Sequence, residues 1–185
     1  KAENRGGFRI QGRDDEGWKR VMADGKAVAE SGLPLHFHTI GTKTPDFESM
    51  PPLQGRPAKA VHITGIQLGN IGILMEIIYS GVLETYPSLN VVIAESGIGW
   101  IPYALDRMDF EFEDRFRDLM KLKPSEYWQR QCKATFQYDP IGPMLVNARN
   151  LMTEDTIMWG SDYPHTDGIW PESSKYIEEQ FAGLT

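Results

Sequence analysis

The chain has 185 residues, of which 41% are hydrophobic and 24% charged, and these values are ordinary for one globular domain with a buried core. Its formal net charge of −7 argues against a nucleic-acid surface, because no basic block is present to neutralise phosphates. The single cysteine, Cys132, excludes an intrachain disulfide and the disulfide-rich secreted class. We expect a cytoplasmic protein with one domain over residues 1–185 and no membrane span, since the apolar run at residues 71–79 is too short for one.

Strand-like and helix-like segments alternate in the first part of the chain, which favours a parallel α/β fold. Residues 8–11 are a short candidate strand, and acidic residues at 14–16 then open a helix that Gly32 ends. The next strand covers residues 33–38. Residues 39–57 contain four prolines and no periodicity, so we expect a long loop beyond the end of that strand.

The same alternation continues to the C-terminus. An apolar pattern predicts a buried helix over residues 71–81, and residues 91–94 are hydrophobic at every position, as in a strand buried on both faces of a parallel sheet. The later elements are expected as a helix from residue 97 with a charged extension at 111–117, a short helix at 125–130, a strand at 133–138, a helix at 143–150, a strand at 156–160 and a helix at 171–181. Five such units suffice for an open sheet, and they would also make about five-eighths of an eight-stranded barrel.

Two histidines stand at the end of the strand predicted at residues 33–38. His36 and His38 are two residues apart, so their side chains point to the same face of the strand. Imidazoles placed in this way can bind one metal ion, such as zinc or manganese. The structural alternative is a histidine satisfied by hydrogen bonds in a polar interior. The position at the strand end favours His38 over His36 as a ligand.

Another strand end delivers a carboxylate, because the apolar run at residues 157–160 stops at Ser161 and Asp162. A carboxylate there can bind a metal, or take a proton from water bound to it. The structural alternative is an aspartate that closes a turn. His165 follows after a proline, where it could contact a substrate or line the loop.

Glu95 directly follows the hydrophobic strand at residues 91–94. A buried glutamate is costly unless it is paired, so a metal, an arginine or a histidine should lie near it. A structural salt bridge with Arg107 is an alternative of equal weight. Arg56, in the predicted loop, could make a bidentate contact with a substrate carboxylate. His62 lies in no periodic pattern, and we expect it on the surface or in a loop.

Two other kinds of site are disfavoured. Ser96 lies in Glu-Ser-Gly, but the G-x-S-x-G pattern of a nucleophilic serine is not met, because residue 94 is alanine. The glycines at 97 and 99 lack the third glycine of a phosphate-binding loop. A metal or acid/base site therefore ranks above serine catalysis and nucleotide binding.

Three segments together resemble one family. They are GLPLHFHTIG at residues 32–41, VIAESGIGWIPYALDRMD at 92–109 and MWGSDYPH at 158–165. They are similar to segments of the amidohydrolase-related TIM-barrel proteins, in the branch that includes aminocarboxymuconate semialdehyde decarboxylase. The resemblance runs through nearly the whole chain and implies an α/β fold of the (β/α)8 barrel type. It also implies that His38 is the strand-five metal ligand and that Asp162 is the strand-eight aspartate, which binds metal or handles the proton.

The chain departs from this family pattern in two places. Many relatives have a histidine at the end of strand six, where this chain has Glu95, so the role of that histidine cannot be carried over. The family's first metal motif, a His-x-His or Glu-x-His on strand one, should lie far upstream. His36-Phe-His38 has the same spelling, but it follows a complete helix and matches the strand-five context. We therefore expect only about strands four to eight of the barrel in this chain, its C-terminal part.

The resulting expectation is a metal-dependent hydrolase or carboxy-lyase that acts on a small, carboxylated organic substrate through a metal-bound water. The cofactor would be a divalent metal ion, Zn²⁺ first and Mn²⁺ as the alternative. Metal ligation is assigned to His38 and Asp162, catalysis to Asp162, Glu95 and His165, and substrate contact to His36 and Arg56.

Two other interpretations stay open: a catalytically silent barrel fragment or subunit that lacks the strand-one motif, and a complete open-sheet protein that binds an anionic ligand without turnover. The expected partners are a small-molecule substrate, with neither nucleic acid nor membrane. Unpaired strand edges and an aromatic-rich tail also predict a homo-oligomer.

Overall fold

The structure is a computed structural model that describes residues 15–38, 54–165 and 168–184. A parallel sheet of four strands forms its centre, and the strands lie in the chain order β1-β2-β3-β4. β1 is Leu35–His38, β2 is Val91–Ala94, β3 is Cys132–Phe136 and β4 is Ile157–Trp159. Four of the five predicted strands are therefore confirmed, and the strand predicted at residues 8–11 lies outside the described residues.

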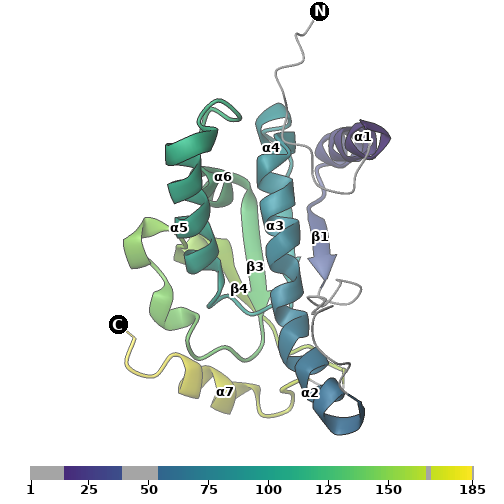
Figure 1. The fold of residues 1–185 in the computed structure, drawn as a ribbon. Helices are drawn as coiled ribbons and strands as arrows, with labels where there is room; N and C mark the ends of the chain where they lie inside the picture. The colour runs from purple at the N-terminus through teal and green to yellow at the C-terminus, as the bar shows by residue number, and fades with distance from the viewer. Residues whose placement is uncertain (1–14, 39–53, 166–167, 185) are drawn as a thin grey trace, which may run out of the picture.

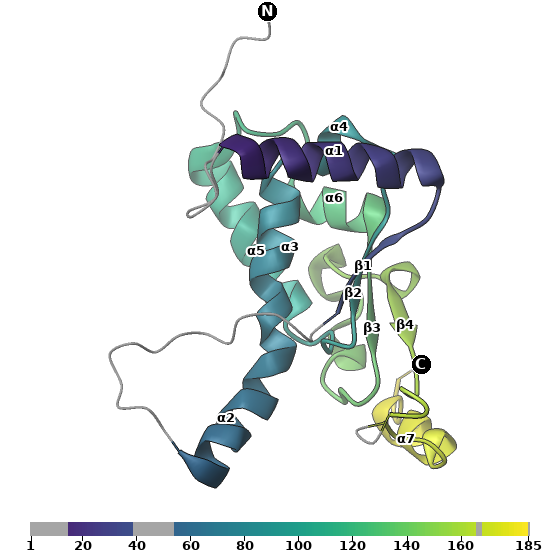
Figure 2. The same cartoon turned by 90° about the vertical axis from the view of Figure 1, so that its right-hand side faces the viewer.

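Parallel neighbours require crossover connections. α-Helices connect β1 to β2 and β2 to β3, whereas 3-10 turns connect β3 to β4. The α-helices are α1 (Asp15–Ser31), α2 (Gly55–Ile66), α3 (Asn70–Tyr79), α4 (Val82–Thr85), α5 (Ile101–Glu111), α6 (Pro124–Gln131) and α7 (Ser173–Gln180). The described residues also form short helical turns, of which η2 is a π-helix and the others are 3-10 helices: η1 (Gln67–Gly69), η2 (Phe112–Phe116), η3 (Pro143–Leu145), η4 (Ala148–Asn150) and η5 (Glu154–Thr156). Figures 1 and 2 show α3 and α5 along one side of the sheet, and α2 and α7 beyond the carboxyl ends of the strands.

The two faces of the sheet differ in what covers them. One face carries a row of apolar side chains in register, namely Phe37, Ile93, Ala134 and Ile157. On the opposite face His36 and Lys133 flank Val92, and both are exposed. Since side chains alternate between the faces of a strand, His38 lies on the same face as His36. The predicted shared face of the two histidines is confirmed.

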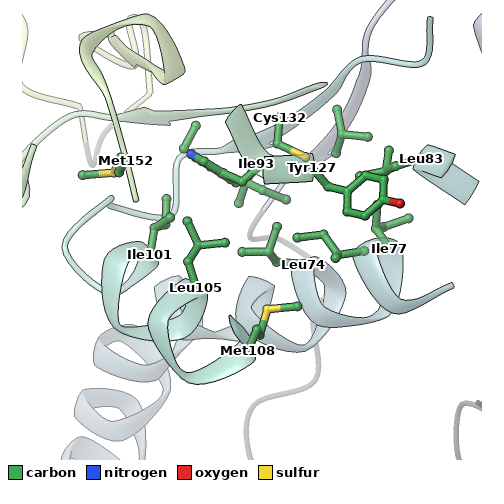
Figure 3. Close-up of a cluster of buried hydrophobic side chains, with 14 of the residues drawn as sticks. Leu74, Ile77, Leu83, Ile93, Ile101, Leu105, Met108, Tyr127, Cys132 and Met152 are labelled. Carbon is green, nitrogen blue, oxygen red and sulfur yellow. The ribbon is translucent and has the colours of Figure 1, made fainter. Parts of the chain in front are cut away.

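The hydrophobic core lies between the apolar face of the sheet and the helices that cover it. Figure 3 shows Ile93 of β2 facing Leu74 of α3 and Leu105 of α5, with Tyr127 of α6 close by. All four side chains are fully buried. Cys132 is also buried, at the start of β3.

The helical region after the first strand is longer than the sequence analysis predicted. The loop was expected to reach residue 57, but α2 begins at Gly55, and His62 is an exposed residue of this helix. Residues 39–53 of the predicted loop lie outside the described residues. With η1 and α3, α2 makes one helical stretch, Gly55–Tyr79, that is long and apolar enough to cross a membrane by length and composition alone. This is weak support for a membrane span, because core helices often pass the same test, and α3 buries Leu74 in the core.

The helix predicted over residues 143–150 is wrong. Two 3-10 turns, η3 and η4, stand there instead, and Asn147 between them has a φ of 64°. This left-handed conformation cannot continue a right-handed helix. The backbone N–H of Asn147 donates instead to the carbonyl oxygen of Met152 at 2.7 Å, which ties the segment to the chain that leads into β4.

Candidate functional site

The carboxyl ends of the parallel strands bring polar side chains to one edge of the sheet. His38 is the last residue of β1, and Glu95 directly follows β2, its neighbour in the sheet. His38 Nε2 and Glu95 Oε2 are 2.7 Å apart and share a hydrogen bond. Both side chains keep contact with solvent, with exposed fractions of 40% and 31%. The histidine expected as a possible partner of Glu95 is therefore His38.

The alternative partner of Glu95 is not used. Arg107 instead pairs with Glu111, one turn further along α5. The structural salt bridge that the sequence allowed between Glu95 and Arg107 is therefore wrong, because Arg107 directs its guanidinium along its own helix.

The backbone of Glu95 is held in an unusual conformation. Its φ is 53°, in the left-handed region that non-glycine residues rarely adopt. Its N–H donates to Thr135 Oγ1 of β3 at 2.8 Å. The hydroxyl of the neighbouring strand thus accepts the N–H of a residue that has just left β2, and the glutamate side chain is turned toward His38.

A second pair follows the last strand. Asp162 Oδ2 lies 3.0 Å from His165 Nδ1, and the backbone N–H of His165 donates to the carbonyl oxygen of Asp162 at 2.8 Å. Asp162 also has a positive φ, 57°. Its side chain is 14% exposed and that of His165 is 59% exposed. The turn therefore holds the carboxylate half-sheltered beneath a more accessible imidazole.

The two residues predicted to contact substrate are both exposed. His36 is exposed on β1, on the same face as His38, and Arg56 is exposed in the first turn of α2 rather than in a loop. Their role in substrate contact stays a prediction.

Metal ligation requires more donors than either pair supplies. A catalytic zinc ion takes about three protein ligands. Within residues 15–38, 54–165 and 168–184, no group of three or more His, Cys, Asp or Glu side chains is placed to hold a metal ion. The described side chains alone therefore do not form a complete metal centre, and the assignment of His38 and Asp162 as ligands stays a prediction.

Asp139 is a polar residue of this edge that the sequence analysis missed. It follows β3 by three residues, and its carboxylate accepts hydrogen bonds from the backbone N–H groups of Ile98, Gly99 and Gly142. The signal was present in the sequence, because Asp139 comes after a strand just as Glu95 and Asp162 do.

A depression of about 380 Å³ opens beside the turn that follows Glu95. Its lining comes from the end of α2 with η1, from the turn after β2 and from the segment after β3, and includes Gln67, Ser96, Trp100, Tyr138 and Asp139. Ser96, which the sequence disfavours as a nucleophile, is buried, and its hydroxyl donates to the carbonyl oxygen of Gly97.

Known proteins share this arrangement of strands and helices. An amidohydrolase from Mycobacterium avium subsp. paratuberculosis K-10 superposes with a TM-score of 0.70 at 18% identity, covering 90% of this chain and 41% of that one. A 2,6-dihydroxybenzoate decarboxylase complexed with 2,6-dihydroxybenzoate gives 0.56 at 14% identity, covering 85% and 48%. A dihydroxybenzoic acid decarboxylase from Polaromonas sp. JS666, with bound manganese and an inhibitor, gives 0.52 at 14% identity, covering 89% and 48%.

These likenesses establish the fold. The four-stranded sheet with its helices is part of a (β/α)8 barrel, as the sequence predicted, and the chain spans less than half the length of the three solved structures. The interpretation as a complete open-sheet protein is therefore set aside. No curated protein matches the sequence. A family model described as amidohydrolase matches residues 5–184, nearly the whole length. The chain therefore belongs to the amidohydrolase family.

Proposed function

We propose that this chain supplies one side of the active site of a metal-dependent hydrolase or carboxy-lyase. The observation that carries the proposal is the pairing of His38 with Glu95 and of Asp162 with His165, each at the carboxyl end of a strand of the parallel sheet. Active sites of (β/α)8 barrels lie at this end. Family membership supports enzyme chemistry there.

The proposed cofactor is a divalent metal ion, Zn²⁺ or alternatively Mn²⁺. His38 and Asp162 would contribute ligands, and the remaining ligands would come from outside the described residues, since these hold no complete ligand group. When bound, such an ion lowers the pKa of a water ligand or polarises a substrate oxygen.

The side chains of this chain would hold and move protons around the reacting group. Glu95 Oε2 lies 2.7 Å from His38 Nε2, so Glu95 can accept a proton from that nitrogen and fix the orientation of the ring. His165 Nδ1 can donate a hydrogen bond to Asp162 and so orient its carboxylate, which is the more sheltered of that pair. Glu95 acts as proton carrier or further ligand, and Asp162 as ligand and proton acceptor.

The proposed substrate is a small carboxylated aromatic compound. Two of the solved structures with this fold are named as dihydroxybenzoate decarboxylases, and one holds 2,6-dihydroxybenzoate. The guanidinium of Arg56 suits a substrate carboxylate, because it can bind both oxygens at once. His36, on the face that carries His38, would contact the ring or its hydroxyl groups.

Metal binding tests the proposal directly. Zn²⁺ and Mn²⁺ are titrated separately into the purified chain by isothermal calorimetry, and elemental mass spectrometry measures the metal carried through purification. We expect binding that His38→Ala and Asp162→Ala each weaken by at least about ten-fold, because each removes a ligand. His62→Ala, at an exposed position of α2, is the matched control and should bind as the parent chain does. Unchanged metal affinity in both ligand variants would refute the assignment.

A second candidate is a catalytically silent barrel subunit. It is favoured by one observation, the lack of any group of three or more potential metal ligands among the described residues. In that case a folded chain takes up neither metal, and a screen of hydroxylated benzoates shows no turnover. Metal uptake that depends on His38 and Asp162 would contradict this candidate.

We also propose that the chain self-associates and acts in the cytoplasm. In the described sheet β1 and β4 each have a neighbour on one side only, and unpaired strand edges favour association. Sedimentation equilibrium should give a mass at least about twice the 21.0 kDa of one chain. A monomer across the concentration range would contradict self-association.

A further inference from the structure

The carboxylate of Asp139 is enclosed by backbone donors. Oδ2 accepts from the N–H groups of Ile98 and Gly99, both at 2.7 Å, and Oδ1 accepts from the N–H of Gly142 at 2.9 Å. Hydrogen bonds to an ionised acceptor are stronger than neutral ones. Two of these three donors belong to the turn that connects Glu95 to α5. Asp139, which follows β3, is therefore hydrogen-bonded to a turn that follows β2.

The turn from Glu95 to Gly99 is held at both ends by residues of the β3 side. At its start the N–H of Glu95 donates to Thr135 Oγ1, and at its end Asp139 binds Ile98 and Gly99. Glu95 has a φ of 53°, a conformation that a free turn would leave. These two attachments therefore fix the backbone that aims the Glu95 carboxylate at His38.

Close packing leaves the turn little room to shift. A Cβ added at Gly97 would lie 3.2 Å from Asp139 Oδ2, and one added at Gly99 would lie 3.3 Å from either oxygen. A Cβ at Gly142 would overlap the side chain of Ile98, at 2.2 Å from its Cγ1. Glycine at these positions lets the amides approach the carboxylate directly.

An amide cannot replace this carboxylate. Asparagine has one acceptor oxygen and an NH₂ group that only donates, so at position 139 its NH₂ would face either Gly142 N–H or the N–H groups of Ile98 and Gly99. The negative charge also lies at the N-terminal end of the 11-residue helix α5, where the helix dipole favours an anion.

We propose that Asp139 is a positioning residue that holds Glu95 in place for its pairing with His38. The pairing itself is a property of the chain, and only the consequence for turnover rests on the proposed function. Asp139 acts through the backbone of the turn from Glu95 to Gly99 and does not need to touch the substrate.

The test follows the side chain of His38 by nitrogen-15 NMR of the full chain at one fixed pH, without metal. The chain has four histidines, so single His→Ala variants assign their signals. Glu95→Ala defines the signal of His38 in the absence of the Glu95 carboxylate. We expect Asp139→Asn to move the His38 signal toward that position. The backbone amide hydrogens of Ile98 and Gly99 should exchange with solvent about ten-fold faster. In Asp139→Asn their acceptor is either replaced by an NH₂ group or becomes an uncharged oxygen.

A matched control separates positioning from general stability. Asp109 on α5 also binds a helix start through backbone and hydroxyl donors, accepting from Ser125 N–H at 2.9 Å and Ser125 Oγ at 2.6 Å. Asp109→Asn should lower stability by a similar amount and leave the His38 signal unchanged. In the Glu95→Ala background, Asp139→Asn should cause no further movement, because the residue through which it acts is already gone.

The outcomes decide the proposal. A His38 signal that stays at its parent position in Asp139→Asn, or that moves equally with and without Glu95, would overturn it. Asp139→Ser, which keeps one acceptor oxygen, is the second variant in case the first does not fold. Loss of folding in both, with Asp109→Asn folded, would assign Asp139 to the fold alone and also overturn the proposal.

The same variants distinguish this inference from the proposed function. If metal uptake fails but His38 still responds to Asp139→Asn through Glu95, the positioning role stands and the metal assignment falls. If metal binding and turnover are present, Asp139→Asn should reduce turnover about 10- to 100-fold. Full turnover together with an unmoved His38 signal would leave the proposed function standing and remove the role of Asp139.

Discussion

Two carboxylate residues of the candidate site share a backbone feature, since Glu95 and Asp162 both have φ near +55°, with values of 53° and 57°. Non-glycine residues in this region cost about 1–2 kcal/mol relative to a right-handed conformation. Each is compensated by local hydrogen bonds, from Glu95 N–H to Thr135 and from His165 N–H to the Asp162 carbonyl. The strain is stored where the proposed chemistry takes place, as is common at functional sites.

Substitution at position 95 should separate this strain from the role of the side chain. Glu95→Gly relieves the backbone and Glu95→Ala does not, so we expect the glycine variant to be more stable by about 1 kcal/mol. Both lose the contact with His38. Urea unfolding followed by circular dichroism measures the difference. Equal stability of the two variants would show that the left-handed conformation at residue 95 carries no cost.

At the scale of elements, the carboxylate of Glu84 joins α4 to α6. Glu84 of α4 accepts a hydrogen bond from Tyr127 of α6 and pairs with Lys121 just before that helix. Hydrogen bonds from Lys121 and Tyr127 lower the pKa of Glu84. Burial, and then the hydrogen bond to Glu84, raise the pKa of Tyr127 to about 12.

The tyrosine makes the chain sensitive to alkali. Because the pKa of Tyr127 is raised on folding, its contribution to stability is full below the pKa of about 10 in the unfolded chain and is lost as pH rises toward 12. Tyr127→Phe should lower the free energy of unfolding by about 1 kcal/mol at neutral pH. Between about pH 10 and 12 the variant should lose less stability than the parent chain does. Thermal unfolding across that pH range measures it.

Tyr103→Phe is the control for this prediction. Tyr103 is exposed on α5, so its substitution should leave the alkaline profile as it is. If Tyr127→Phe also leaves the pH dependence of stability unchanged, Tyr127 is not the cause of the alkaline sensitivity.

At the scale of the whole molecule, Cys132 reports on global unfolding. It is the single cysteine, it is buried at the start of β3, and burial raises the pKa of its thiol to about 12. The thiolate is the reactive form, so the native thiol should resist alkylation. We expect labelling by a maleimide at neutral pH only as urea unfolds the sheet, with a midpoint that matches circular dichroism. Fast labelling without urea would mean that β2, β3 and β4 unfold locally while the rest of the protein stays folded.

Most elements could be predicted because their signals are local. The strand at 91–94 was placed to the residue, since an unbroken apolar run admits few other structures. The helix α2 was missed, and none of its residues is buried, so it has no apolar side packed into the core. The predicted helix at 143–150 failed because Asn147 takes a left-handed conformation, which its residue type permits but does not require.

The candidate site was predictable in its members and less so in its connections. Alternation along a strand placed His36 and His38 on one face, and strand ends located Glu95 and Asp162. The partner of Glu95 could not be chosen between a histidine and Arg107, because that depends on which strands are neighbours. The hydrogen bonds from Ile98 and Gly99 to Asp139 join residues about 40 positions apart, and no local sequence pattern predicts such a contact.

The sequence by itself determined the parallel α/β class, the family, and the residues that end each strand, because apolar periodicity and short motifs are written along the chain. The tertiary structure alone decided which of those residues meet. Sheet order sets His38 beside Glu95, and the packing of the segment after β3 against the start of α5 sets Asp139 beneath that turn. Contacts of this kind arise between segments brought together by folding, so their geometry exists only once the sheet has formed.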